Sequence, residues 1–239
     1  MRLDTLIIEK KLTRSRSVAS ELIKKGLVKV NGKIIIKPST KFSEGVVIEI
    51  IEQPKYVSRG GLKLEKALIE FKINPKDLIV LDIGSSTGGF TDCLLQNSAK
   101  KVYAVDVGTD QFDPKLKNDP RIILMEKTDI RKIDLLPEKP DLAVIDVSFI
   151  SLELILKKVI DLLSPNAKII ALIKPQFETN KKDKNKSGVV KNDKLRKDSV
   201  EKIKNYASKI GLGVLKIIDS PLLGGAGNKE YFILLQNRG

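Results

Sequence analysis

Three aspartates stand where the chain is expected to leave a buried strand, and carboxylates in that position can hold a ligand. Asp82 lies in the run L-D-I-G-S-S-T-G-G-F, two residues before Gly84. Asp106 follows the apolar run V-Y-A-V, and Asp129 comes shortly after I-I-L-M. A glycine-rich turn between a strand and a helix lets a ligand approach the backbone and the helix N-terminus. The spacing therefore predicts a ligand site made from one such turn and these acids.

The charge of Asp82 indicates which ligand the turn accepts. A carboxylate there would repel a pyrophosphate, whereas it can pair with the ammonium of an amino acid. The dinucleotide pattern G-x-G-x-x-G also needs a second glycine where this chain has Ser86, so a nicotinamide dehydrogenase is a distant alternative. S-adenosylmethionine carries an ammonium and a sulfonium and no phosphate, and it is the cofactor that we expect.

The other two aspartates complete the predicted cofactor site. Asp106 can accept hydrogen bonds from both ribose hydroxyls, and Asp129 is placed to contact the adenine amino group. The predicted cofactor-binding residues are Asp82, Gly84, Ser85, Ser86, Thr87, Gly88, Gly89, Phe90, Asp106, Val107, Asp129, Ile130 and Asp146.

Four further charged residues stand beside expected strands. Lys63 precedes the first strand, in S-R-G-G-L-K-L, whereas Asp146 ends A-V-I-D and Lys174 ends A-L-I-K. Glu230 opens the last strand, before Y-F-I-L-L. In an open α/β sheet the carboxyl ends of the parallel strands form the ligand crevice. Asp146 and Lys174 are therefore expected at the crevice, and Glu230 joins them if the last strand runs antiparallel.

These residues depend on strands and helices that alternate from about Lys76 onward. We expect strands at 78–83, 101–107, 122–127, 142–146, 168–173, 213–218 and 231–235, and helices at about 89–96, 151–163 and 193–210. Near-continuous apolar strands that alternate with helices are typical of a mostly parallel sheet with both faces covered. The predicted fold class is α/β, a Rossmann-like, doubly wound sheet of seven strands. The lysine-rich segment 179–194 is expected to be a mobile loop.

Residues 1–51 have the pattern of a small α+β module. The apolar residues of a first helix face are Leu3, Leu6, Ile7 and Leu12. A second helix is expected from Ser15, which could cap it, to Lys25, with Gly26 ending it. Short strands follow at 27–30, 33–36 and 46–51, and Asn31-Gly32 between the first two is a strong hairpin signal. A linker at 52–58 leads to the second domain, 59–239.

Basic side chains gather on the predicted helix pair. They are Arg2, Lys10, Lys11, Arg14, Arg16, Lys24 and Lys25. With the interleaved hydroxyls they offer charge and donors to a phosphate backbone, although an ordinary solvated helix face is the alternative. The net charge of +14 also suits a polyanionic partner. The predicted RNA-binding residues are Arg2, Lys11, Arg14, Arg16, Lys24, Lys25 and Arg59.

The composition excludes several kinds of chemistry. The chain has no histidine and a single cysteine, Cys93, so an imidazole base, a Cys/His zinc site and an internal disulfide are ruled out, and no metal is expected. No apolar run reaches the roughly 18 residues of a membrane helix, so no membrane partner is expected. The start Met1-Arg2-Leu3-Asp4 is unlike a signal peptide, and we expect the protein in the cytoplasm.

Three family resemblances rest on these motifs. The pattern K-L-T-R-S-R-S-x-A-x-x-L-I-K-x-G-x-V-x-V-N-G-K, within 2–51, resembles the RNA-binding module named after the fourth small-subunit ribosomal protein. Lys63, Asp146, Lys174 and Glu230 resemble the Lys-Asp-Lys-Glu tetrad of the FtsJ-like ribose 2'-O-methyltransferases. The whole chain is similar to the TlyA family, also labelled hemolysin A, through S-R-G-G-x-K-L, D-I-G-S-S-T-G-G-F-T-D, D-V-S-F-I-S-L, L-I-K-P-Q-F-E and G-N-x-E-Y-F.

The resemblance implies a class I S-adenosylmethionine-dependent methyltransferase that modifies the 2'-hydroxyl of cytidine in ribosomal RNA. Its partner would be ribosomal RNA or a ribosomal subunit. Lys174 would be the base or a stabiliser of the oxyanion. It must be neutral to act as a base, which a nearby Lys63 favours and the two acids of the tetrad oppose. A membrane-acting hemolysin and a non-catalytic assembly factor that binds RNA are the rival functions.

Less specific assignments concern the rim of the site. Ser148, Phe149 and Phe177 are candidates for shaping the target pocket, with a core position as the alternative for Phe149. Arg59 would grip an RNA phosphate or pair with a nearby acid. The lysines of 181–191 could clamp RNA, although a solvated charge run is the simpler interpretation. The modified nucleotide, the subunit and the oligomeric state are left open.

Overall fold

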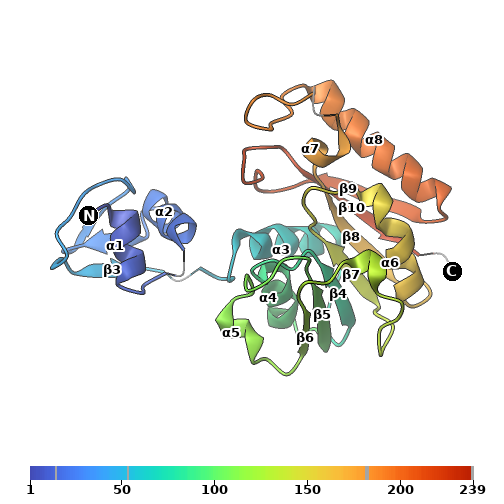
Figure 1. Cartoon of the computed structure of the whole chain (residues 1–239), viewed down its shortest axis with the longest axis horizontal. Coiled ribbons are helices and arrows are strands. Elements are labelled where there is room, and N and C mark those ends of the chain that lie inside the picture. The colour runs from blue at the N-terminus through green and yellow to red at the C-terminus, as the bar shows by residue number, and fades with distance from the viewer. Residues whose placement is uncertain (14, 53, 181–182, 238–239) are drawn as a thin grey trace. The chain divides into compact units, whose positions relative to one another are not determined.

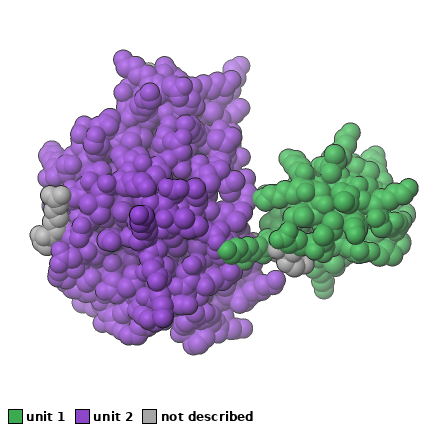
Figure 2. Space-filling model, turned by 180° about the vertical axis from the view of Figure 1, so that it is seen from behind, with its two compact units in different colours: residues 1–55 green, residues 56–239 purple. Residues whose placement is uncertain are grey.

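The computed structural model describes residues 1–13, 15–52, 54–180 and 183–237 (Figure 1). The chain divides into two compact units, residues 1–55 and 56–239 (Figure 2). The division falls inside the linker predicted at 52–58. The domain limits predicted from the sequence remain a proposal, and each unit is described separately below.

The small unit has two helices packed on a three-stranded sheet. Helices α1 (Leu3–Glu9) and α2 (Arg16–Lys24) precede the strands β1 (Val28–Val30), β2 (Lys33–Ile34) and β3 (Ile48–Ile50). The sheet order is β2-β1-β3, with both pairings antiparallel. Its core consists of Leu3, Ile7, Ala19, Leu22, Ile23, Val28 and Val30.

Local signals in the small unit have the expected effect. The Ser15 hydroxyl caps α2 by accepting a hydrogen bond from the backbone N–H of Val18 at 3.3 Å. Asn31 and Gly32 have φ angles of 48° and 77°, the left-handed values that a tight hairpin turn requires. Leu12, predicted to lie on the first helix, comes after the end of α1, although it still packs against the core.

The large unit contains a seven-stranded sheet with the order β6-β5-β4-β7-β8-β10-β9. Its strands are β4 (Ile79–Ile83), β5 (Lys101–Val105), β6 (Ile122–Met125), β7 (Leu142–Ile145), β8 (Lys168–Ile173), β9 (Gly213–Asp219) and β10 (Tyr231–Gln236). Strands β4 to β8 are parallel neighbours, and β10 is antiparallel to both β8 and β9. The predicted α/β class, with a mostly parallel sheet, is confirmed.

Two hydrophobic cores lie on opposite faces of this sheet, because successive strand residues point to opposite sides. Helices α3 (Arg59–Phe71) and α4 (Gly89–Gln96) cover one face. Helices α6 (Leu156–Leu162) and α8 (Asp193–Lys209) cover the other (Figure 1). The short helices α5 (Pro114–Lys117) and α7 (Pro175–Glu178) and the 3₁₀ turns η1 (Ile130–Lys132) and η2 (Leu152–Leu154) lie in the connections.

Two helical predictions need correction. The helix expected over 151–163 is divided, because the chain forms η2 first and α6 begins only at Leu156. Helix α3, which carries Lys63, was not predicted. Gly60 and Gly61 at its start obscure the helical pattern, yet a Cβ on Gly61 would lie 2.3 Å from the ring of Tyr56. Glycine is therefore needed there for the tyrosine to pack against the helix.

No helix among the described residues has the length and apolarity to cross a membrane.

Candidate active site

The carboxyl ends of the parallel strands bring the predicted residues to one edge of the sheet. Asp82 is the penultimate residue of β4, and Asp146 and Lys174 directly follow β7 and β8. Glu230 directly precedes β10, whose first residue, Tyr231, pairs with Ile173 of β8. The antiparallel direction of β10 thus places Glu230 beside Lys174, as the sequence analysis required.

The four residues of the predicted tetrad form two ion pairs. The Lys63 ammonium lies 2.6 Å from Glu230 Oε2, and the Lys174 ammonium lies 2.7 Å from Asp146 Oδ1. Lys63 reaches this edge from α3, and both it and Glu230 are buried. Lys174 also donates a hydrogen bond to Ser148 Oγ at 3.0 Å. The structure therefore brings two cations and two anions together at the carboxyl ends of β7 and β8 and the start of β10.

The two pairs are electrostatically connected. Burial raises the pKa of Asp146 above its usual value, and the neighbouring Glu230 carboxylate adds to this effect. The lysines Lys174 and Lys63 oppose it. The pKa of Asp146 thus depends on all the other members of the tetrad, as expected for charges in one poorly solvated site.

The glycine-rich loop between β4 and α4 passes close to the tetrad. Gly84 has φ of 82°, and a Cβ there would lie 2.7 Å from the backbone oxygen of Asp146. Ser86 and Gly88 also take left-handed values, of 47° and 86°. Gly84 therefore allows this loop to pass against the residue that follows β7, and Gly88 and Gly89 lead into the N-terminus of α4.

Asp82 is a buried acid with an unsatisfied oxygen. Its Oδ2 accepts a hydrogen bond from Thr91 Oγ1 at 2.6 Å. Its Oδ1 and the hydroxyl of Ser85 are buried without a hydrogen-bond partner among the described residues. Burial raises the pKa of Asp82 to about 7, and the nearby Asp146 and Asp106 carboxylates contribute to the rise. A cationic ligand would supply the missing partner, so these residues fit the ammonium of S-adenosylmethionine.

Asp106 and Asp129 already have protein partners. Asp106 accepts hydrogen bonds from the backbone N–H groups of Ser86 at 2.8 Å and Gly108 at 2.7 Å. Asp129 forms a bidentate ion pair with Arg131, whose hydrogen bonds lower the pKa of this aspartate to about 2. Each carboxylate oxygen can accept more than one hydrogen bond, so both acids keep capacity for a ligand.

Some of the residues predicted to contact the cofactor have side chains that lie in the hydrophobic core. Phe90 and Ile130 are buried core residues, and Phe90 packs near Phe232 with ring centroids 6.3 Å apart. A cofactor contact at these two positions would have to use the backbone. Val107 next to Asp106 is exposed. Thr87 accepts a hydrogen bond from Asp113 through its backbone oxygen.

Phe149, three residues after Asp146, is 91% exposed and has φ of 65°. Its ring lies 5.1 Å from that of Phe177, at an angle of 50°. The interpretation of Phe149 as a core residue is therefore wrong. An aromatic side chain held in solvent beside the tetrad is available to stack on a ligand.

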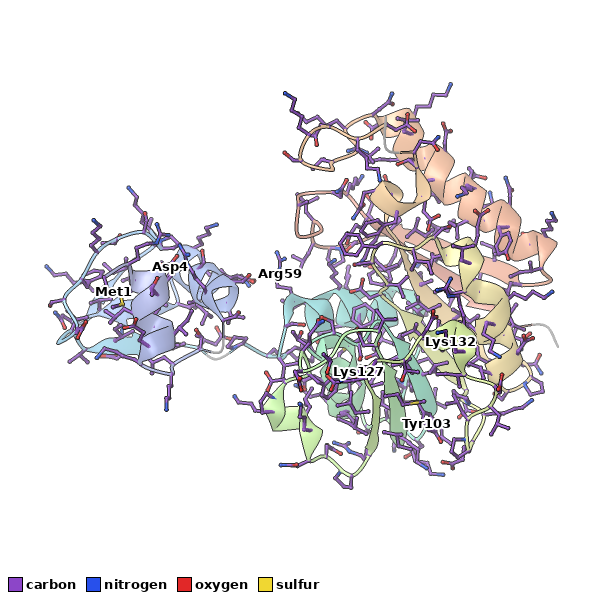
Figure 3. All side chains as sticks on the ribbon, viewed as in Figure 1. Met1, Asp4, Arg59, Tyr103, Lys127 and Lys132 are labelled. Atoms are coloured by element: carbon purple, nitrogen blue, oxygen red, sulfur yellow. The ribbon has the colours of Figure 1, made fainter. Side chains whose placement is uncertain are left out.

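The predicted RNA-binding residues of the small unit divide into two groups. Arg2 and Arg16 both hydrogen-bond to the buried Asp4 of α1, which Figure 3 labels, and these contacts lower the pKa of Asp4. They therefore also stabilise the fold. Lys11, Lys24 and Lys25 are exposed, with Lys25 paired to Glu21 at 2.9 Å. Arg14 lies outside the described residues. In the large unit, Arg59 is exposed at the start of α3 (Figure 3).

Gln176 and Thr91, which hydrogen-bond to predicted site residues, were not identified from the sequence. Gln176 donates a hydrogen bond to Glu230 Oε1 at 3.2 Å, and Thr91 satisfies one oxygen of Asp82. Both lie in motifs that were recognised, L-I-K-P-Q-F-E and D-I-G-S-S-T-G-G-F-T-D. The motifs thus contained a signal for them, but only the structure shows which partner each one contacts.

Comparison with known proteins confirms the resemblances. The family model of the FtsJ-like methyltransferases matches residues 56–237, and that of the S4 domain matches residues 1–48. The 16S/23S rRNA (cytidine-2'-O)-methyltransferase TlyA of Mycobacterium tuberculosis is 39% identical over 99% of this chain and 90% of its own length. Hemolysin A of Brachyspira hyodysenteriae is 44% identical over 97% of this chain and 98% of its own.

A solved structure supports the same assignment. A hemolysin-named protein from Streptococcus thermophilus is 41% identical and superposes with a TM-score of 0.79 over 99% of this chain and 88% of that one. The chain therefore belongs to the FtsJ-like methyltransferases and begins with an S4 domain.

Proposed function

We propose that this protein transfers a methyl group from S-adenosylmethionine to the 2'-hydroxyl of a cytidine in ribosomal RNA. The observation that carries the proposal is the tetrad geometry, with ion pairs of 2.6 Å and 2.7 Å beside the glycine-rich loop. The substrate is supported by the 39% identical relative that is named a 16S/23S rRNA (cytidine-2'-O)-methyltransferase. A substrate in the ribosome would place the protein in the cytoplasm.

The cofactor would bind across the ends of β4 and β5. Asp82 Oδ1 and Ser85 Oγ, which are buried without a hydrogen-bond partner in the described part of the chain, would hold the cationic amino-acid part. Asp106 would accept hydrogen bonds from the ribose hydroxyls, and Asp129 would contact the adenine amino group. When bound, S-adenosylmethionine supplies an electrophilic methyl carbon attached to sulfur.

The tetrad would prepare the acceptor oxygen. In methyl transfer the new O–C bond forms as the C–S bond breaks, and the ribose hydroxyl loses its proton, so alignment supplies much of the acceleration. Lys174 is the residue that we assign to that proton or to the developing negative charge on oxygen. Asp146 and Ser148 fix the position of its nitrogen, at 2.7 Å and 3.0 Å. Lys63 and Glu230 would complete the site beside them.

RNA would be held at three places. The exposed ring of Phe149 offers a stacking surface for a base that is turned out of its helix. In the S4 domain Lys11, Arg14, Lys24 and Lys25 would contact phosphates, and Arg2 and Arg16 would add charge while they pair with Asp4. Arg59 would contact the RNA backbone from the start of α3.

The proposal is tested by methyl transfer from isotopically labelled cofactor to ribosomal RNA, followed by nucleoside analysis. The expected product is 2'-O-methylcytidine, formed with naked RNA, a subunit or the whole ribosome. A label found only on a nucleobase, or in none of these substrates, would contradict the proposal. Because a 44% identical relative is named Hemolysin A, liposome leakage should be measured with the same preparation, and no leakage is expected.

A further inference from the structure

A buried carboxylate outside the tetrad connects the two chain segments that follow Asp146 and Lys174. Glu178 is the last residue of α7, the short helix that directly follows Lys174. Its side chain is only 2% exposed, yet among the described residues its hydrogen bonds and ion pairs involve no member of the tetrad. The proposed reaction gives it no role, so its burial needs another explanation.

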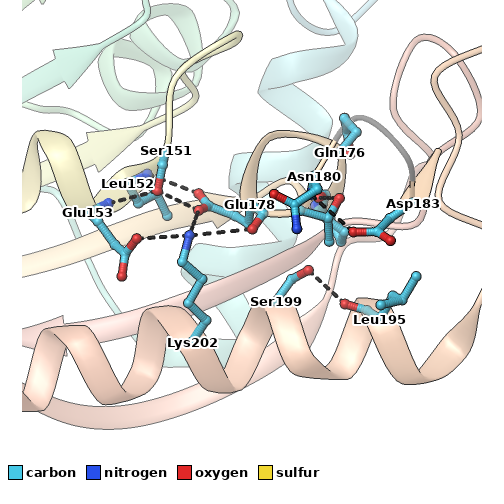
Figure 4. A network of polar contacts seen from close by, with 12 residues as sticks. Ser151, Leu152, Glu153, Gln176, Glu178, Asn180, Asp183, Leu195, Ser199 and Lys202 are labelled. Carbon is cyan, nitrogen blue, oxygen red and sulfur yellow. Dashed lines mark hydrogen bonds and ion pairs between the residues drawn. The ribbon is translucent and has the colours of Figure 1, made fainter.

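Both carboxylate oxygens of Glu178 bind the segment that follows Asp146 (Figure 4). Oε2 accepts a hydrogen bond from Ser151 Oγ at 2.5 Å. Oε1 accepts one from the backbone N–H of Leu152, the first residue of η2, at 2.9 Å. We call this set of contacts the Glu178 clamp.

Lys202 of α8 compensates the negative charge of Glu178. Lys202 Nζ lies 3.5 Å from Glu178 Oε2 and 2.8 Å from Glu153 Oε2 (Figure 4). It also donates a hydrogen bond to the backbone oxygen of Glu178 at 3.4 Å. The buried carboxylate is therefore both hydrogen-bonded and charge-compensated, which fixes its position.

The clamp and the tetrad connect the same two segments at different points. Near the strands, Lys174 contacts Asp146 and Ser148. Farther along, Glu178 contacts Ser151 and Leu152. Phe149 lies between these connections, with an exposed ring and a left-handed backbone. A non-glycine residue keeps such a backbone conformation only when its surroundings hold it.

We propose that Glu178 is a positioning residue for methyl transfer, which holds the loop of Ser148 and Phe149 at a fixed distance from Lys174. This inference rests on the proposed function. Its consequence is that the loop should shift when the clamp is removed, even though every residue of the tetrad is retained. A displacement of about 1 Å at a reacting group can reduce a rate by roughly 100-fold.

The first test compares Glu178→Ala with Glu178→Gln. The alanine variant should lower kcat by about 10-fold to 100-fold at saturating RNA and cofactor, with an unchanged dissociation constant for S-adenosylhomocysteine. The glutamine variant should stay within about threefold of the natural protein, because its amide oxygen can accept from Leu152 and the Ser151 hydroxyl can accept from its amide nitrogen. Glu153→Ala is the matched control: it removes the other carboxylate partner of Lys202, leaves the clamp in place and should keep kcat.

The second test follows the loop without using activity. The chain has no tryptophan, so Phe149→Trp introduces a single fluorescent reporter. Adding Glu178→Ala to this variant should change the emission maximum and the quenching by acrylamide, whereas adding Glu178→Gln or Glu153→Ala should not. If the natural protein has no methyltransferase activity, the proposed function fails, and the fluorescence test still decides the clamp.

A folded Glu178→Ala protein with unchanged kcat, or with unchanged fluorescence of Trp at position 149, would overturn the inference. If Glu178→Ala does not fold, Ser151→Ala, which removes one of the two contacts, takes its place. That variant should show a smaller loss of kcat and the same direction of fluorescence change. Full activity of Ser151→Ala would then refute the positioning role.

Discussion

The edge of the sheet that carries the site has two halves. Asp82 and Ser85 form the donor half, which would hold the methyl donor, and the tetrad forms the acceptor half, which would prepare the methyl acceptor. The two halves satisfy their polar groups differently. In the donor half, two buried oxygens have no hydrogen-bond partner among the residues described. In the acceptor half, each carboxylate has a lysine within 2.7 Å. Asp146 Oδ1 also has no hydrogen-bond partner among the residues described, but unlike Asp82 Oδ1 it lies in such an ion pair, with Lys174. The donor half is thus organised to gain stability from a cationic ligand, whereas the acceptor half is already stabilised by its own charges.

The comparison teaches that removing one charge should have opposite effects on stability in the two halves. Removing a tetrad residue leaves a buried partner unpaired, which is destabilising. Removing the Asp82 charge takes away an unfavourable buried carboxylate.

Breaking the buried tetrad pair should give the largest loss of stability. Lys63→Met leaves Glu230 buried without its ammonium and should lower the free energy of unfolding by about 3 kcal/mol. Chemical denaturation monitored by circular dichroism measures this. Lys66→Met is the matched control on the same helix, since Lys66 pairs with Glu70 in solvent, and it should change stability by less than about 0.5 kcal/mol.

The double variant Lys63→Met/Glu230→Gln should recover most of the loss, because no charge is then left unpaired. Equal stability of Lys63→Met and Lys66→Met would show that the buried pair does not stabilise the acceptor half as described.

Removing the Asp82 charge should instead raise the free energy of unfolding. The pKa of Asp82 is raised to about 7 in the folded protein, so its ionised form is disfavoured there. The natural protein should therefore lose stability relative to Asp82→Asn as the pH rises from about 4 to about 7. Above that range Asp82→Asn should be more stable by roughly 2–4 kcal/mol.

The same substitution should weaken the cofactor site. Asp82→Asn should bind S-adenosylhomocysteine about tenfold less tightly near pH 7.5, because an amide cannot pair with the ligand ammonium. In the natural protein, binding should tighten as the pH rises from 5.5 to about 7.5, while the variant should show a flatter profile. Calorimetric titrations at several pH values measure both. A stability difference independent of pH would contradict the account of the donor half.

The exposed aromatic ring should matter only for RNA. Phe149→Ala should lower kcat/KM for RNA by about tenfold, the effect of losing one base–aromatic contact. Because the ring is 91% exposed, the free energy of unfolding and the affinity for S-adenosylhomocysteine should stay unchanged. Phe149→Tyr keeps a stacking surface and should retain most activity. A Phe149→Ala protein that uses RNA normally would leave the ring without a role in binding the target.

The sequence predicted the sheet well because its signals were local. Largely apolar runs of strand length located all seven strands of the large sheet within about two residues of their ends. The position of Glu230 followed from topology alone, since an antiparallel last strand begins where its parallel neighbour ends. The fold class and the proximity of Asp146, Lys174 and Glu230 were therefore accessible from residue order.

What the sequence did not reveal depends on tertiary contacts. Helix α3 was hidden by Gly60 and Gly61, and the need for Gly61 becomes visible only where Tyr56 packs on it. The exposure of Phe149 comes from a left-handed backbone that sequence alone does not indicate. The pairing of Lys63 with Glu230 joins residues at opposite ends of the domain, and Glu178 contacts a segment with no short-range relation to it.

The most direct test of the separation between the halves uses Lys174→Ala. With the donor half intact, this variant should bind S-adenosylhomocysteine with the affinity of the natural protein, while methyl transfer to ribosomal RNA falls by about 1,000-fold or more. Single-turnover transfer of labelled methyl and calorimetric binding, measured on the same preparation, report the two halves together. Transfer at close to the natural rate, or a loss of cofactor binding equal to the loss of transfer, would contradict the account.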